Sequence, residues 1–100
     1  MKQTIYTGHV RSHYVPKNKL QEAVSNYLDT LDGKAFTKEQ YLRKRVEIGV
    51  TINELNKQHP RATPVKIDWY VSKQPTGKAI HFIHGIQAID FSFITGELDL

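Results

Sequence analysis

The densest group of charged side chains in the sequence is the run Arg43-Lys44-Arg45. Lysine and arginine contact the phosphates of nucleic acids without reading the bases, so a basic surface predicts sequence-independent binding to a phosphate backbone. Three further cations lie close enough in the sequence to extend it: Lys38, Lys57 and Arg61. The competing interpretation is a solvated helix face, on which Glu39 would pair with Arg43. The run therefore indicates an acidic partner if its side chains share one accessible side.

Lys66 and Tyr70 add an aromatic side chain to this basic character. They lie in a segment whose polar and apolar residues alternate, so both should point to the outward face of one strand. An exposed aromatic beside a cation is what some sheet surfaces use to stack nucleic-acid bases. Sheet-based RNA-binding proteins usually display two or three such aromatics. Tyr70 is the one expected on this face, because other aromatics are expected to point inward: Trp69, Phe82, Phe91 and Phe93.

Asp68, His81 and Asp90 form the strongest candidate for catalysis, because each is expected in mid-strand beside core-facing apolar residues. On one exposed sheet face they would form a carboxylate and imidazole cluster capable of general acid–base chemistry. No nucleophile or anion-holding loop accompanies them, and solvent faces of sheets ordinarily carry polar residues. Glycine-rich phosphate loops, nucleophile elbows and His-Glu-x-x-His pairs are absent from the sequence. We therefore predict no catalytic residue and expect the protein not to be an enzyme.

The five histidines raise the question of a metal site. A transition metal needs three or four convergent ligands. His9 and His13 would point the same way on a strand, whereas His81 and His84 would point in opposite directions. The sequence has no cysteine, which removes thiolate ligands, thiol nucleophiles and disulfides. We expect no metal ligands and no cofactor.

A first helix is predicted between Pro16 and Asp32, where apolar residues recur at helical spacing. Pro16 suits the first turn, and Gly33 suits the left-handed position that commonly ends a helix. A second helix should start at Thr37, because Thr37 and Gln40 have the spacing of a capping box.

The extent of the second helix has two interpretations. Residues 46–53 alternate between apolar and polar types, as a half-buried strand would. We favour a helix that continues to His59-Pro60, because a strand would leave residues 54–63 as a long connection. That helix carries two apolar stripes: Tyr41, Ile48, Ile52 and Leu55 in one, and Leu42, Val46 and Val50 in the other.

The remaining elements are predicted as strands. Residues 3–14 precede the helices, and 65–72 alternate clearly after them. The turn at 74–77 should return the chain antiparallel as a strand over 79–84, and residues 86–94 follow beyond Gly85. The predicted architecture is an α+β two-layer sandwich in the order β-α-α-β-β-β, with a mainly antiparallel sheet and two helices on one face.

Length and composition agree with one folded domain spanning residues 1–100. Hydrophobic residues make up 39% and charged residues 24%, which is the ordinary globular balance. No apolar run reaches the length of a signal peptide or a membrane span, so we expect a cytoplasmic protein that does not bind a membrane. The net charge of +4 favours acidic partners. Its excess lies mid-chain, since residues 34–66 hold eight basic residues and three acidic ones.

Two functional hypotheses follow. The first is a small non-enzymatic binding or regulatory module whose basic helical surface engages an acidic partner, with nucleic acid as first choice. The predicted binding residues are Lys38, Arg43, Lys44, Arg45, Lys57, Arg61, Lys66 and Tyr70. The alternative is a protein–protein interaction module or inhibitor that docks a partner, or a second copy in a homodimer, through a sheet edge, a sheet face or the acidic tail 96–100. A small His/Asp-dependent enzyme comes third.

Overall fold

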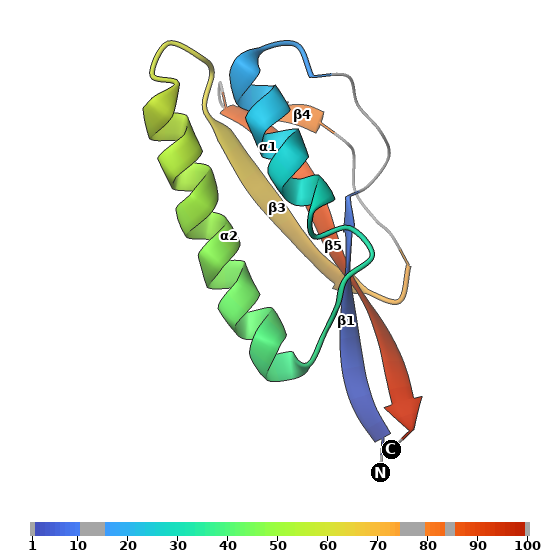
Figure 1. Ribbon diagram of the computed structural model, residues 1–100. Helices are drawn as coiled ribbons and strands as arrows, with labels where there is room; N and C mark the ends of the chain where they lie inside the picture. The colour runs from blue at the N-terminus through green and yellow to red at the C-terminus, as the bar shows by residue number, and fades with distance from the viewer. Residues whose placement is uncertain (1, 11–15, 75–79, 84–85, 100) are drawn as a thin grey trace.

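The computed structural model describes residues 2–10, 16–74, 80–83 and 86–99, with 80–83 and 86 described by their backbone (Figure 1). The elements follow in chain order: β1 (Lys2–Val10), α1 (Lys19–Asp29), β2 (Ala35–Phe36), α2 (Lys38–Gln58), β3 (Val65–Ser72), β4 (Ile80–Ile83) and β5 (Ile86–Asp99). Both helices and the alternate β5 residues Ile89, Phe91 and Phe93 contribute to one buried cluster. The helices therefore cover the same face of the sheet, and the predicted α+β two-layer architecture is confirmed.

The long strand β5 organises the sheet, whose order is β2-β1-β5-β3 with β4 paired to β5 off this path. β1 and β4 run antiparallel to β5, β2 runs antiparallel to β1, and β3 runs parallel to β5. The sheet is thus mostly antiparallel, as predicted. β4 also runs antiparallel to β3, but its neighbour is β5. The turn predicted at 74–77 lies largely outside the described residues.

α1 begins and ends close to the positions that the sequence indicated. Asn18 is its N-cap, and the Asn18 side chain accepts a hydrogen bond from the Gln21 amide at 2.8 Å. Pro16 therefore precedes the helix and does not occupy its first turn. The helix ends at Asp29, and Gly33 adopts the left-handed conformation with φ of 78° in the turn that follows. Leu20, Val24 and Leu28 are buried.

α2 is helical throughout residues 38–58, so the helical interpretation of 46–53 is confirmed. Its capping box is complete, because the Gln40 amide donates to Thr37 Oγ1 and the Thr37 amide donates to Gln40 Oε1. The alternation that resembles a strand arises because residues two apart in a helix lie on nearly opposite sides. One set is the buried row of α2: Tyr41, Ile48 and Ile52. The other is the exposed row: Leu42, Val46 and Val50, which are 50%, 68% and 58% exposed.

Aromatic packing joins β5 to its neighbours at the centre of the core. Phe91 and Phe93 are fully buried and contact each other edge to face, with ring centroids 5.1 Å apart. Trp69 of β3 stacks on Phe93 at 5.9 Å. Gly8 of β1 is required where the chain passes Leu31, because a Cβ atom at position 8 would lie 2.6 Å from the Leu31 carbonyl oxygen.

The acidic end of the sequence belongs to the sheet. Residues 96–99 complete β5 and pair with residues 2–5 of β1. Lys2 Nζ lies 3.6 Å from Glu97 Oε2. β1 and β5 extend together beyond the helices as a two-stranded ribbon (Figure 1), and the molecule measures 50 × 22 × 22 Å. None of the helices described has the length and apolar character to cross a membrane.

Candidate protein-interaction groove between α2 and β3

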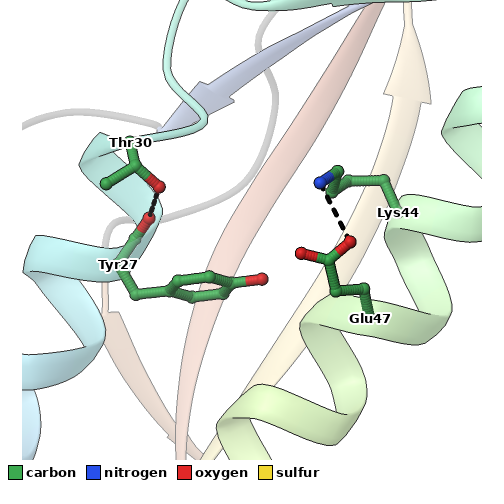
Figure 2. A network of polar contacts seen from close by, with 4 residues as sticks. All are labelled: Tyr27, Thr30, Lys44 and Glu47. Carbon is green, nitrogen blue, oxygen red and sulfur yellow. Dashed lines mark hydrogen bonds and ion pairs between the residues drawn. The ribbon is translucent and has the colours of Figure 1, made fainter.

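Two of the three members of the basic run, Lys44 and Arg45, pack against the protein. Lys44 Nζ lies 3.0 Å from Glu47 Oε2 and 5.8 Å from the centre of the Phe36 ring, and the Lys44 side chain is 24% exposed. Figure 2 shows this ion pair on α2, with the Tyr27 ring pointing towards it from α1. At the end of α1, the Tyr27 main-chain carbonyl accepts a hydrogen bond from the hydroxyl of the C-cap residue Thr30. Lys44 is therefore paired with a carboxylate of its own helix.

Arg45 lies on the opposite flank of α2. Its guanidinium donates a hydrogen bond to the Tyr41 hydroxyl at 3.1 Å and lies over the Trp69 ring, 5.2 Å from the ring centre. This geometry couples α2 to the middle of β3. Arg43, which precedes the two packed cations in the sequence, is exposed. The three members of the run thus point in three directions.

The other predicted cations are spread over the molecule. Lys38 and Lys57 lie near opposite ends of α2, about 30 Å apart along its axis. Lys57 pairs with Glu54 at 3.6 Å, and Lys66 of β3 pairs with Asp68 at 3.3 Å. Arg61 lines a hollow of about 650 Å³ with Asn18 and His59. Two of its polar groups already have partners, since Asn18 caps α1 and His59 Nδ1 contacts the Leu55 carbonyl.

The residues of β3 that were predicted to point outward lie beside buried residues of β5. Tyr70 shares a face with Lys66, as alternation predicted, but it is half-buried and pairs in register with Ser92. Asp68 pairs with Asp90, and His81 pairs with Ala88, so the backbone brings the three candidate acid–base residues onto neighbouring strands. The expectation of an exposed face was wrong, because Ala88, Asp90 and Ser92 are buried.

The described histidines are separated. His9 belongs to β1, and its Nδ1 lies 3.8 Å from Asp32 Oδ1, whereas His59 is the C-cap of α2. His13, His84 and the side chain of His81 lie outside the described residues. Within the part of the chain that the structure describes, no group of three or more residues of metal-ligand type comes together.

One edge of β3 has no strand beside it among the described residues. The Gln87 amide donates to the Pro64 carbonyl at 3.0 Å, and this bond determines which residues of β3 direct their backbone groups towards β5. Residues 66, 68, 70 and 72 direct both backbone groups towards β5, and residues 65, 67, 69 and 71 direct theirs away from it. We call the latter side the free edge.

Asn56 of α2 occupies the first position of the free edge. Its side-chain amide donates to the Val65 carbonyl at 2.8 Å and accepts from the Val65 amide at 3.0 Å. This two-bond contact reproduces what a neighbouring strand would supply, so the buried Val65 backbone is satisfied. The backbone groups of Ile67, Trp69 and Val71 continue the free edge beyond it.

Two adjoining hollows lie between α2 and the free edge, with Trp69 in the wall of both. One, of about 320 Å³, is lined by Leu42, Arg45, Val46 and Trp69. The other, of about 290 Å³, is lined by residues of α2 that include Gly49, Asn53 and Asn56 and by Val65, Lys66, Ile67 and Trp69 of β3. Together they form the α2–β3 groove, which the exposed row flanks. A depression bounded by a helix and an unpaired strand can receive an extended chain segment.

Comparisons with known proteins give no relative: no family model, no curated protein and no solved structure matches this chain. The groove itself was not predicted from the sequence. Its two components were visible as the second apolar stripe of α2 and the alternating segment 65–72, but their proximity depends on the strand order.

Proposed function

We propose that this protein is a protein-interaction module that binds an extended segment of its partner as an added strand in the α2–β3 groove. The observation that carries this proposal is the juxtaposition of the free edge with the exposed row of α2. Main-chain groups at Ile67, Trp69 and Val71 would supply hydrogen bonds, and Leu42 and Val46 would supply apolar contact. The proposal requires no catalytic residue and no cofactor.

The energetic contributions of the two components differ in kind. Each backbone hydrogen bond formed with an added strand contributes a net of about 0.5–1.5 kcal/mol. Burial of exposed aliphatic surface contributes about 25 cal/mol per Å², and three side chains of the exposed row, together with Val71 at 46% exposure, offer such surface. Backbone pairing therefore supplies orientation, and the aliphatic side chains select apolar residues in the partner.

The nucleic-acid hypothesis has less support from the geometry. It depended on basic side chains that gather on one accessible side, whereas Lys44, Lys57 and Lys66 have carboxylate neighbours and Arg45 packs on Trp69. Lys38, Arg43 and Arg61 are the exposed members of the set without an ion pair among the described residues. Three separated cations give little electrostatic attraction at physiological salt.

Selection of peptides from a random-sequence display library, followed by amide hydrogen exchange, tests the proposal. Bound peptides should slow exchange at Ile67, Trp69 and Val71. Val71→Pro should abolish binding, because it removes an amide that faces the free edge while leaving the ladder to β5 intact. Val71→Thr, which keeps the amide, is the matched control. Peptides that bind Val71→Pro as tightly as the unmodified protein, with no change at those amides, would place the binding site elsewhere.

A further inference from the structure

The free edge of β3 can pair with a second copy of itself in very few ways. An antiparallel dimer requires residues with edge-facing backbone groups to lie opposite each other. These are the odd-numbered residues of β3, and Val65 among them is already bonded to Asn56. The remaining edge-facing residues are Ile67, Trp69 and Val71.

Charge and hydrogen bonding select one of these registers. A register centred on Ile67 would place Trp69 opposite Val65, whose backbone is occupied. A register centred on Asp68 would place two carboxylates opposite each other, which is destabilising. A register centred on Trp69 places Ile67 opposite Val71 on both sides of the two-fold axis and uses all three edge-facing residues. Three residue pairs, each exchanging two bonds, give about six backbone hydrogen bonds.

The same register matches the side chains on both faces of the strand. On the helix side, Ile67 and Val71 are both aliphatic and Trp69 meets its own copy. On the other side, Asp68 lies opposite Tyr70 and Lys66 opposite Ser72, so no like charges oppose each other. A strand that is complementary to itself in this way meets the requirement of an isologous interface, in which one patch serves both subunits.

The exposed row of α2 is explained by the same arrangement. A two-fold axis perpendicular to the sheet keeps both copies of α2 on one face and makes them antiparallel. Leu42 and Val46 line the groove, Val50 continues their row along α2, and the three are the most exposed large aliphatic residues of that helix. In the dimer the Leu42 and Val46 side chains of both copies would border the joined strands. A single added peptide would cover the groove but leave the outer part of this row in water.

From these observations we propose that the partner that binds in the α2–β3 groove is β3 of a second copy of this chain, with Trp69 on the two-fold axis. The dimer then has one continuous sheet through both copies, covered on one face by four helices. This inference rests on the proposed function and names its partner.

Sedimentation equilibrium of the full chain over a range of concentrations gives the first test. The unmodified protein should be a dimer, and Val71→Pro and Val46→Lys should each shift it to a monomer. Val71→Thr should remain dimeric. Circular dichroism of the two monomeric variants should match that of the unmodified protein, since Val71 lies on the free edge and Val46 in the exposed row of α2. A dimer that persists in both Val71→Pro and Val46→Lys would overturn the inference.

Cysteine crosslinking tests the register, and the absence of native cysteines makes it specific. Lys66 and Ser72 are opposed in a pair without mutual hydrogen bonds, where Cα atoms lie about 4.5 Å apart, within the range of a disulfide. Lys66→Cys and Ser72→Cys should each stay uncrosslinked alone and form a covalent dimer when mixed and mildly oxidised. Crosslinking of either variant with itself at the same rate would overturn this register.

The outcomes also separate this inference from the proposed function. If the unmodified protein is monomeric at every concentration while selected peptides still protect Ile67, Trp69 and Val71 from exchange, self-association is wrong and strand addition by another protein stands. If neither dimer nor peptide engages these amides, both proposals fail.

Discussion

The buried and exposed rows of α2 are both apolar and both recur at helical spacing, but their surroundings differ. Ile48 and Ile52 are at most 4% exposed beneath α2, whereas Val46 and Val50 are more than half exposed on its side. The buried row meets Phe93 and the rest of the core, whereas Leu42 and Val46 of the exposed row line the groove beside the free edge. Helical periodicity therefore identified both rows as apolar, and the elements beside them determined which became core and which became surface.

The comparison is sharpest for single substitutions in the two rows. Ile48→Ala should lower the free energy of unfolding by about 2–5 kcal/mol, because it removes a fully buried side chain from the core. Val46→Ala should change the stability of the monomer by less than about 0.5 kcal/mol. Urea denaturation of both variants, each in the Val71→Pro background that removes the proposed dimer, measures the difference. Equal effects would mean that the exposed row is also part of the core.

Asn56 links the helix to the free edge and provides the second comparison. Asn56→Ala should cost about 1–3 kcal/mol, because the buried backbone groups of Val65 lose both partners. Asn53→Ala is the matched control, since Asn53 is exposed on the preceding turn of the same helix. The melting temperature of Asn56→Ala should lie clearly below that of Asn53→Ala, and the reverse order would contradict the role of the Asn56 amide.

Two glycines contrast a packed position with an open one. Gly8→Ala should destabilise by about 1–3 kcal/mol, because the new Cβ would lie 2.6 Å from a backbone oxygen that cannot easily move. Gly49→Ala should instead stabilise by about 0.5–1 kcal/mol, since position 49 is in a helix and has no atom within 4 Å of the added Cβ. Calorimetric melting temperatures should therefore move in opposite directions.

The smallest effect is expected at the exposed cations. A double variant with Lys38→Gln and Arg43→Gln should change stability by less than about 0.5 kcal/mol and leave the dimer intact. Titration with duplex DNA of random sequence at two salt concentrations is the matching measurement. Tight binding that weakens steeply with salt and is lost in the double variant would favour the basic surface over the groove as the functional site.

Local features of the fold followed from the sequence, whereas the relations between distant elements did not. The capping box at Thr37 and the bounds 65–72 of β3 were predicted correctly, because they depend on neighbouring residues. The parallel pairing of β3 with β5 depends on strand order, which no local pattern encodes. Two features of the sheet were not predicted. β2 is an additional strand of two residues, and β5 continues five residues past position 94 to Asp99.

The candidate site shows the same division. The presence of a second apolar stripe on α2 was predicted, but its exposure beside the free edge required coordinates. The pairing of the lysines could have been predicted in part from the sequence. Glu47, Glu54 and Asp68 lie two or three positions from the lysines with which they form ion pairs. Counting net charge along the sequence missed this local pairing.

The unequal edges of the sheet limit how far the protein can assemble. β3 offers three open positions bounded at one end by Asn56, while the opposite side of the sheet carries β2 with two residues and β4 with four. An interface that uses the same edge of both molecules would occupy that edge, so no further chain could add at β3. In the proposed dimer this edge therefore joins two chains and cannot extend the assembly to a third.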